Sequence, residues 1–477
     1  MKKQCHNPYL PSWEYIPDGE PHVFGDRVYV YGSHDRFNGY AFCLNDYVCW
    51  SAPVNDLSDW RYEGVIYRRT DDPKNPDGEM CLYAPDVTRG ADGRYYLYYV
   101  LDYLPIVSVA VCDTPAGKYT FYGYVHYPDG TLLGEGINDQ PQFDPGVLYE
   151  DGKVYLYTGF CPRQDSSRLG AMATVLEPDM LTIRKPPVFV APSLPHGEGT
   201  GYEGHTFFEA SSIRKIGDTY YFVYSTNLHH ELCYATSKDP TGTFTYRGTL
   251  VSAIDLGIDS YKPADMPVNY NGNNHGGIEQ IDGQWYVFYH RHTNGSSFCR
   301  QGCIEPITIL EDGSIPQVEV TSSGAGRMLQ GKGSYPTYTA CHLFRPSDET
   351  FSVKPGFWLD CPQPRITQEG RDGDENPGFI ENLRDGAIVG FKYFDCQDIR
   401  RITVVVRGGS GGTGGGKGGV LEVSTSWNGP SCGEIPVGTS NEWKSYSAPV
   451  TVPDGKQALY FRYKGDRGIS FASFTLE

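Results

Sequence analysis

One motif recurs five times along the first two thirds of the chain. Each copy has an acidic residue or a histidine, a short apolar stretch, a glycine turn and a tyrosine-rich stretch. The copies read DGEPHVFGDRVYVYGS, DVTRGADGRYYLYYV, DPGVLYEDGKVYLYTG, EASSIRKIGDTYYFVYS and HGGIEQIDGQWYVFYH, and they begin at Asp18, Asp86, Asp144, Glu209 and His275. A period of about 65 residues means that one supersecondary unit is built five times and that neighbouring units share a core.

Each copy is predicted to be a β-hairpin, because GD or DG stands between two runs of strand-forming residues. The period leaves room for four short strands in each unit. A single four-stranded unit cannot bury both of its faces, so such units pack radially around an axis. The sequence therefore predicts an all-β fold with a five-bladed β-propeller, and a repeated array of sandwiches is the alternative.

Composition agrees with an all-β chain and limits the partners. The 37 Tyr, 57 Gly and 34 Pro favour strands and turns over long helices. A net charge of −18 would repel nucleic acid. No apolar run is long enough for a signal peptide or a membrane span, and the 13 Cys show no metal-binding spacing. We expect a cytoplasmic protein with reduced thiols and no membrane contact, and a homo-oligomer stays open.

The first residues of the five copies are expected to meet at the propeller axis. The innermost strand of every blade begins or ends there, so one position of the repeat faces the same funnel five times. Carboxyl groups crowded in this way repel one another, shift their pKa values apart, and attract a metal ion or a polar substrate. The alternative is that these residues only open the turns before the inner strands, as Asp often does.

At these residues the sequence resembles glycoside hydrolase family 43. The resemblance covers roughly residues 5 to 312 and depends on NPYLPSWEYIPDGEP, YAPDV, FFEASSIRKIGDTYYFVYS and NNHGGIEQIDGQWYVFYHRHT. Members of this family are five-bladed propeller enzymes that cleave pentose-containing glycans with inversion. The resemblance implies that Asp18 is the general base, Glu209 the general acid, and Asp86 the residue that tunes the pKa of the acid.

The choice of the acid depends on the phase of the repeat. Family members often carry Glu-Gly-Pro at this position, whereas here Glu209 lies in FEAS and a second candidate, Glu203, lies in YEGH. Glu209 keeps the spacing to its strand tyrosine that the other copies show, and Glu203 does not. We therefore assign the acid to Glu209.

The resemblance also places His275 at the axis, where several family members hold a hydrated calcium ion. Calcium prefers oxygen ligands, so water would have to fill most of its shell. The alternative is a neutral His275 that hydrogen-bonds the carboxylates or the sugar.

Substrate contacts are expected close to the carboxylates. Sugar rings have apolar faces, so Phe37 and Tyr83 are candidates for an aromatic platform, Tyr83 standing where the family often has Trp. Arg291 is a candidate for a sugar hydroxyl, although it would equally suit a surface ion pair. Asp144 either binds substrate or only opens its strand.

The last third has a different pattern. Residues 1–312 are assigned to the propeller, 313–345 to a linker, and 346–477 to a β-sandwich with strands such as RRITVVVRG and ISFASFTLE. The strand pattern resembles carbohydrate-binding modules of family 6. Sugar binding by the sandwich stays open, and we expect a structural role in which it packs on the propeller or shapes the rim of the pocket. The segment Gly408–Gly419 contains GxxxxGK, but Gly418 stands where a phosphate-binding loop needs Ser or Thr.

The resemblance and the expected location favour one function over two rivals. The first is an exo-acting β-xylosidase that trims xylo-oligosaccharides. The close rival is an α-L-arabinofuranosidase, or an enzyme with both activities, acting on arabinoxylo-oligosaccharides. A propeller that binds glycans without catalysis is the rival from another class, because it would need the ring of residues but no ionisation difference between Asp18 and Glu209.

Overall fold

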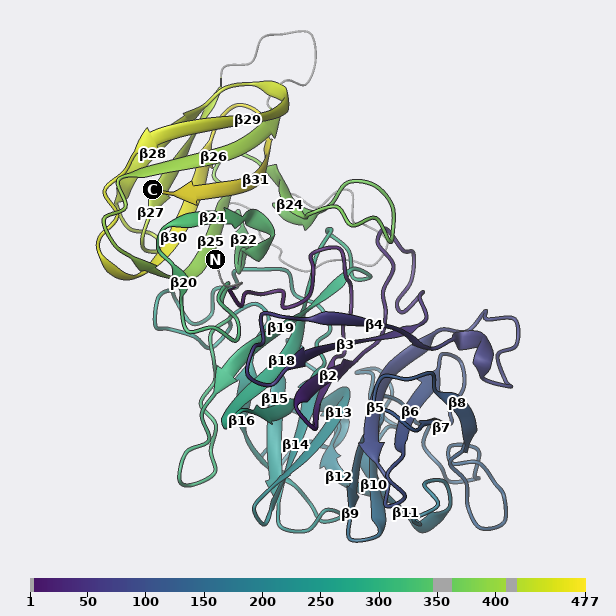
Figure 1. Cartoon of the computed structure of the whole chain (residues 1–477). Coiled ribbons are helices and arrows are strands. Elements are labelled where there is room, and N and C mark those ends of the chain that lie inside the picture. Colours follow the sequence, from purple (N-terminus) through teal and green to yellow (C-terminus); the bar gives the residue numbers. More distant parts are fainter. Residues whose placement is uncertain (1–3, 346–362, 409–417) are drawn as a thin grey trace.

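The computed structural model describes residues 4–345, 363–408 and 418–477 (Figure 1). Regular structure in these ranges is β-strand, apart from three short 3-10 turns at Arg69–Asp71, Leu194–His196 and Thr337–Thr339. No helix of the described ranges is long and apolar enough to cross a membrane. Twelve cysteines are described, and all of them are free thiols. Most of the glycine-rich segment Gly408–Gly419 lies outside the described residues.

Five antiparallel sheets follow one another between Glu20 and Ile307. Four of them have four strands in chain order, and the fifth has three. The first two sheets consist of β1 (Glu20–Phe24), β2 (Arg27–Tyr31), β3 (Tyr47–Pro53), β4 (Arg61–Tyr67), β5 (Leu82–Arg89), β6 (Tyr95–Leu101), β7 (Ser108–Cys112) and β8 (Thr120–Tyr124). The other three consist of β9 (Gly146–Glu150), β10 (Lys153–Thr158), β11 (Gly170–Leu176), β12 (Ile183–Pro192), β13 (Phe207–Ile216), β14 (Thr219–Thr226), β15 (Leu232–Ser237), β16 (Thr245–Val251), β17 (Ile278–Ile281), β18 (Gln284–His292) and β19 (Arg300–Ile307).

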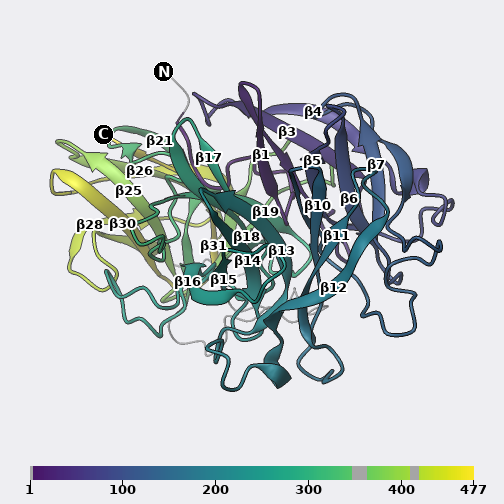
Figure 2. The same cartoon turned by 90° about the horizontal axis from the view of Figure 1, so that it is seen from below.

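The first strands of these sheets lie against one another. Strand β1 contacts both β5 and β17, and β9 contacts both β5 and β13. A parallel bridge between Gly19 and Gly276 joins the beginning of the first sheet to the beginning of the fifth. Figure 2 shows β1, β5 and β13 towards the middle of the repeated part, and β4, β7, β12 and β16 towards its rim. The four-stranded sheets therefore have the form of propeller blades, and each copy of the motif forms the first hairpin of its sheet.

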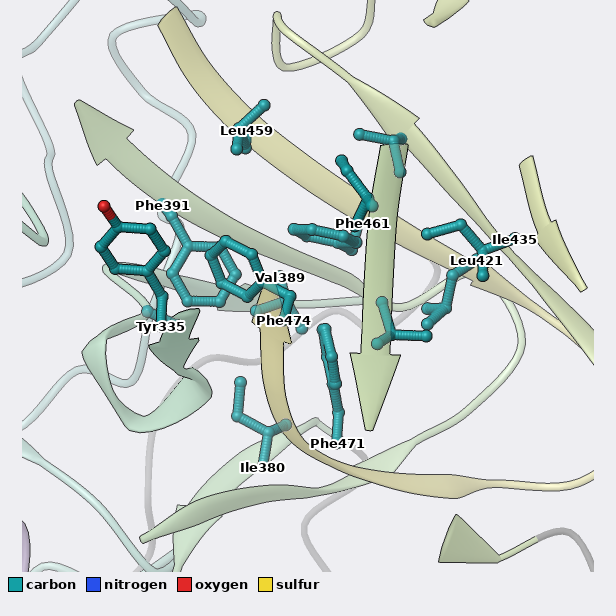
Figure 3. Close-up of a cluster of buried hydrophobic side chains, with 14 of the residues drawn as sticks. Tyr335, Ile380, Val389, Phe391, Leu421, Ile435, Leu459, Phe461, Phe471 and Phe474 are labelled. Carbon is teal, nitrogen blue, oxygen red and sulfur yellow. The ribbon is translucent and has the colours of Figure 1, made fainter. Parts of the chain in front are cut away.

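The C-terminal unit, defined as the described residues from Leu329 onward, contains two six-stranded sheets. One sheet consists of β20 (Leu329–Gln330), β22 (His342–Phe344), β25 (Ile388–Cys396), β27 (Gly419–Ser424), β28 (Ser431–Val437) and β30 (Gly455–Lys464). The other consists of β21 (Gly333–Pro336), β23 (Arg365–Thr367), β24 (Phe379–Leu383), β26 (Arg401–Gly408), β29 (Ser440–Pro449) and β31 (Ile469–Leu476). Buried side chains of both sheets, including Phe391, Phe461 and Phe474, meet in one apolar core (Figure 3).

The expected linker 313–345 is corrected by this pairing. Its second half contains three short strands, and each of them pairs with a strand of the C-terminal unit: β20 and β22 with β25, and β21 with β31. The C-terminal unit thus begins at Leu329 rather than at 346. The strands have two to four residues, so no local pattern separates them from a connection.

The C-terminal unit is hydrogen-bonded to two segments beside the first sheet, one before β1 and one between β2 and β3. The hydroxyl of Tyr15 donates to Gln368 Oε1 at 2.8 Å, and the backbone N–H of Phe37 donates to Asp372 Oδ1 at 2.7 Å. Figure 1 shows the unit beside the ends of the first and fifth sheets. The first sheet's loops are therefore held by a part of the chain that follows all five repeats.

Candidate active site

A cavity of about 400 Å³ opens where the inner strands begin. Four of the five first residues of the repeat line it. Asp18 lies two residues before β1, and Asp144 lies two residues before β9. Glu209 lies in β13, and His275 lies shortly before β17. Arg300, the first residue of β19, also lines the cavity, as do Asp102 and Asn273. The repeat thus brings carboxylates together from blades that lie far apart in the sequence.

Asp18 forms an ion pair with Arg300. The guanidinium Nη1 lies 3.1 and 3.3 Å from the two carboxylate oxygens. The backbone N–H of Asp18 donates to Nδ1 of His290 at 3.2 Å, so this nitrogen carries no proton. Burial lowers the pKa of His290 well below its ordinary value, and the charge of Arg300 adds to this effect. The negative charge of Asp18 is therefore balanced by Arg300 and not by a histidine.

Arg300 itself is fixed on its other side. Its Nε and Nη2 donate to the two oxygens of Asp35 at 2.8 and 2.9 Å, a bidentate pair that sets the plane of the guanidinium. The ring of Phe42 covers the guanidinium at 4.7 Å. Because Arg300 and Asp35 are buried and Phe42 is partly buried, Arg300 is a rigid cation at the side of the pocket.

Glu209 and Asp144 differ from Asp18 in having no cation on their own oxygens among the described contacts. Burial raises the pKa of Glu209 to about 8, and the negative charge of Asp18 adds to the rise while Arg300 opposes it. Burial also raises the pKa of Asp144, and the charges of Glu209 and Asp18 raise it further. The backbone N–H of Ala210 donates to Asp144 Oδ2 at 3.0 Å. One pocket thus holds a carboxyl group paired with a cation, Asp18, and two carboxyl groups whose pKa values burial raises, Glu209 and Asp144.

The structure does not bring Asp86 into this pocket. Its carboxylate lies 2.6 Å from His22 Nε2 and accepts the backbone N–H of Val147 at 2.7 Å. Burial alone would raise the pKa of Asp86, but the charge and the hydrogen bond of His22 keep it below its ordinary value. Asp86 therefore does not line the cavity, whereas Asp144 does, together with Asp18, Asp102 and Glu209.

Asp86 lies outside the pocket because the turn of its hairpin has a different length. In the first sheet Tyr29 pairs with His22, and Asp18 lies four residues before that partner. In the second sheet Tyr96 pairs with Thr88, and Asp86 lies only two residues before it. The turn of the second hairpin is longer than the others, so a similar spacing along the sequence hides a shift of two residues, about 6.6 Å along a strand.

Of three further residues predicted to contact the substrate, two lie outside the cavity and one lines it. Phe37 is buried against Tyr15, with ring centroids 5.8 Å apart, and does not line the cavity. Arg291 donates to the backbone oxygens of Ala340 and Tyr338 at 2.6 and 2.5 Å, which joins the fifth sheet to the C-terminal unit. Tyr83 lines the cavity as expected.

Glu203, the second candidate for the acid, lies outside the pocket. It is exposed, and its carboxylate accepts the backbone N–H of Gly199 at 2.6 Å. Its surroundings lower its pKa through backbone hydrogen bonds, which is the opposite of what a proton donor needs.

An arc of aromatic rings forms one wall of the cavity. Of its members, sequence reasoning had singled out only Tyr83. Neighbouring rings are 5.1 to 5.4 Å apart along the whole arc. The arc runs through Tyr83, Phe143, Phe160, Phe208 and His230. Such a wall suits the apolar face of a sugar ring. The available signal was position, because Phe143 and Phe208 directly precede Asp144 and Glu209.

His275 faces a carboxylate that sequence reasoning did not single out. Its Nε2 lies 3.9 Å from Oε1 of Glu20, and both atoms are buried without a hydrogen-bond partner in the described part of the chain. Burial lowers the pKa of His275 to about 4, so the ring is neutral at pH 7. Two buried acceptor or ligand atoms that face each other in this way fit a cation or a water molecule placed beside them.

Comparison with known proteins gives one family. Residues 15–315 match the sequence profile described as Glycosyl hydrolases family 43. A xylosidase/arabinosidase of Thermoclostridium stercorarium is 65% identical over 477 residues, covering 100% of this chain and 99% of the relative. A xylosidase/arabinosidase of Bacteroides ovatus is 27% identical over 345 residues, covering 65% of this chain and 97% of the relative.

Solved structures show the same architecture. A family 43 beta-xylosidase/alpha-arabinofuranosidase from a compost microbial metagenome, in complex with xylotriose and in a calcium-free form, has a TM-score of 0.52 and 26% identity. The similarity covers 66% of this chain and 98% of that one. An arabinoxylan arabinofuranohydrolase from Bacillus subtilis, in complex with cellotetraose, shares the fold over 98% of this chain and 97% of its own, with a TM-score of 0.51 and 21% identity.

Proposed function

The chain belongs to glycosyl hydrolase family 43, and we propose that it is an inverting, exo-acting β-xylosidase that releases xylose from xylo-oligosaccharides. That it is a glycoside hydrolase follows from the family and from the 65% identical relative. The observation that carries the proposal is the ionisation difference in one pocket: Asp18 is paired with Arg300, and burial keeps Glu209 protonated. An inverting hydrolase needs this combination of one ionised and one protonated carboxyl group.

In this mechanism each carboxyl group handles one proton. Asp18 accepts a proton from a water molecule as the water oxygen bonds to the anomeric carbon. Glu209 gives its proton to the glycosidic oxygen as the bond between that oxygen and the anomeric carbon breaks. The sugar leaves with inverted configuration, and exchange with solvent returns both carboxyl groups to their starting states.

Asp144 takes the role that the resemblance gave to Asp86. Its carboxyl group lines the pocket, and its charge and that of Glu209 disfavour simultaneous ionisation. The hydrogen bond from Ala210, the residue after the acid, fixes Asp144 relative to β13. Asp144 thus positions Glu209, and repulsion between the two carboxylates makes it harder for both groups to lose their protons.

A second activity, hydrolysis of α-L-arabinofuranosides, is favoured by the relatives. The 65% identical protein and the Bacteroides ovatus protein are both named xylosidase/arabinosidase. We expect the purified enzyme to hydrolyse nitrophenyl β-xyloside, and nitrophenyl α-arabinofuranoside more slowly. Initial rates on the two substrates measure the preference. Turnover of the arabinofuranoside alone would reverse the assignment, and binding of xylobiose without turnover of any pentoside would contradict an enzyme.

For the architecture, we propose a five-bladed propeller followed by a β-sandwich with a structural role. Five consecutive sheets and the bridge between Gly19 and Gly276 support the blade count. The contacts of Gln368 and Asp372 with the first sheet's loops support a sandwich that shapes the pocket's surroundings.

For the metal, we propose a calcium ion held by His275 and Glu20 near the axis. The two unpartnered buried atoms, His275 Nε2 and Glu20 Oε1, fit this group, and the carboxylate supplies the oxygen ligand that a lone histidine lacks. When bound, the ion supplies positive charge at the floor of the pocket. Glu20 is also held by Arg214 at 3.2 Å and by Ser212 at 3.0 Å, which keeps its second oxygen in place.

Removal of calcium is expected to lower both thermal stability and activity. Thorough chelation should lower the Tm and the rate on nitrophenyl β-xyloside, and added calcium should restore both, because binding to the folded state stabilises it. The variant His275→Ala should show the lower Tm in both conditions and no response to calcium. An unchanged Tm and rate after chelation would remove the ion from the proposal.

A further inference from the structure

A second cluster of ligand-type side chains lies behind the pocket wall. It consists of His205, just before β13, Glu231, just before β15, and Cys233 within β15. His205 Nδ1 is 3.7 Å from Glu231 Oε2 and 3.9 Å from Cys233 Sγ. One donor atom of each residue lies within 4.8 Å of the others. None of the three lines the active-site cavity, so the proposed hydrolysis makes no use of them.

We propose that His205, Glu231 and Cys233 form a binding site for a zinc ion. Zinc is bound by imidazole nitrogen, carboxylate oxygen and thiolate sulfur at about 2.0 to 2.3 Å. Tetrahedral angles at those lengths place nitrogen and oxygen about 3.4 Å apart, and nitrogen and sulfur about 3.6 Å apart. The observed separations of 3.7 and 3.9 Å exceed these by a few tenths of an ångström, and the third pair of donor atoms lies within 4.8 Å, so the side chains would have to move closer together as the ion binds.

The donor set separates this site from the calcium site at the axis. Calcium takes six to eight oxygen ligands, and the cluster offers one carboxylate, an imidazole and a thiol. Thiolate and imidazole together select zinc and similar transition metals. Three protein ligands leave the fourth position for water, so the ion would be bound at an open site.

The surroundings of the cluster hold the three side chains in place. The ring of Tyr246 stacks on His205 with centroids 4.8 Å apart and an interplanar angle of 9°. The hydroxyl of Thr249 lies 3.4 Å from Cys233 Sγ, and that of Thr226 donates to Glu231 Oε2 at 3.5 Å. Groups of this kind orient metal ligands and stabilise a thiolate.

A zinc ion can reach the cluster from solution, and its binding releases one proton. The side chain of His205 is 34% exposed and that of Glu231 is 12% exposed, so an ion reaches the cluster from the imidazole side. Burial raises the pKa of the Cys233 thiol to about 12, and the thiol is therefore protonated without metal. On binding, the sulfur–hydrogen bond breaks, the sulfur–zinc bond forms, and one proton leaves to solvent.

A bound ion would join two segments of the pocket wall. His230 lies in the wall and directly precedes Glu231, and His205 lies shortly before Phe207 at the start of β13. The backbone of His230 has a φ of 52°, the left-handed region that is uncommon for residues other than glycine. Zinc would therefore fix the segment that carries His230 to the strand that carries Glu209.

Titration of the metal-free full-length protein tests the site. We expect calorimetry to show one equivalent of zinc bound, and cobalt to produce a sulfur-to-cobalt charge-transfer band. The zinc-loaded protein should have a higher Tm. Cys233→Ser should lose the cobalt band, and both Cys233→Ser and His205→Ala should weaken zinc binding by at least about tenfold.

Matched variants keep the test decisive. Cys303→Ser removes another buried thiol, one far from the cluster in sequence, and should leave the zinc titration and the cobalt band unchanged. His205→Ala alters a partly exposed side chain, so it remains informative if Cys233→Ser fails to fold. Absence of saturable zinc binding to the wild type, or zinc binding that persists unweakened in His205→Ala, would overturn the proposal.

Discussion

The variant Glu209→Ala should lose about 10³-fold in rate on xylobiose but less than about tenfold on dinitrophenyl β-xyloside. The xylose leaving group needs a proton on its departing oxygen, whereas dinitrophenolate leaves without one. The pocket supplies that proton because burial raises the pKa of Glu209 to about 8. Initial rates of wild type and variant on the two substrates, measured at one pH, give the comparison.

The same assignment fixes the sign of the alkaline pH dependence. Below about pH 8 Glu209 keeps its proton and donates it, and above about pH 8 the wild-type rate on xylobiose should fall as the proton is lost. On dinitrophenyl β-xyloside, whose leaving group needs no proton, the alkaline fall should be less than about tenfold in the wild type and absent in Glu209→Ala. Glu203→Ala, at an exposed position outside the pocket, is the matched control. Equal losses on both substrates in Glu209→Ala, or a selective loss in Glu203→Ala, would contradict the assignment.

The convergence of the site could be predicted from the repeat, and its departures have local causes. Asp18, Asp144, Glu209 and His275 line one pocket because each opens the inner strand of its own sheet. Asp86 shares the motif but not the position, since the turn before Tyr95 is longer than in the other hairpins. Counting residues between motif and tyrosine includes that turn, so the count does not give the depth along the strand.

For the two arginines of the fifth sheet, the sequence could not predict which one faces the pocket. Arg291 pairs with Gln301, and Arg300 pairs with His292, so the two arginines belong to neighbouring cross-strand pairs. Side chains of neighbouring pairs point to opposite faces of a sheet. The sequence places both arginines in one hairpin, but which face meets Asp18 depends on how the whole sheet is packed. Arg291 consequently binds the C-terminal unit, and Arg300 binds Asp18.

The boundary of the C-terminal unit escaped prediction for a reason of sequence distance. Strand β20 pairs in parallel with β25, whose residues follow about 65 positions later, and β21 pairs with β31 at the end of the chain. Such pairings depend on contacts between segments remote in sequence, and strands of two to four residues carry too few side chains for a period.

The variant Asp18→Gly should lose about 10³- to 10⁴-fold in kcat on xylobiose and on dinitrophenyl β-xyloside alike. Attack by water needs a base whichever group leaves, so an activated leaving group gives no relief. Glycine suits the backbone there because Asp18 has a φ of 57°. The substitution leaves one side of the buried Arg300 guanidinium without its partner, which is expected to lower the Tm. The Tm must therefore be measured together with the rates.

Azide distinguishes a lost base from a damaged pocket. Azide is a nucleophile that needs no deprotonation, and as an anion it can replace the carboxylate that Arg300 bound at 3.1 Å. Millimolar azide should therefore restore part of the turnover of dinitrophenyl β-xyloside by Asp18→Gly and yield a glycosyl azide of inverted configuration. It should not restore turnover of xylobiose by Glu209→Ala, because the leaving oxygen still lacks a proton. A glycosyl azide of retained configuration, or full activity of Asp18→Gly without azide, would show that Asp18 is not the base.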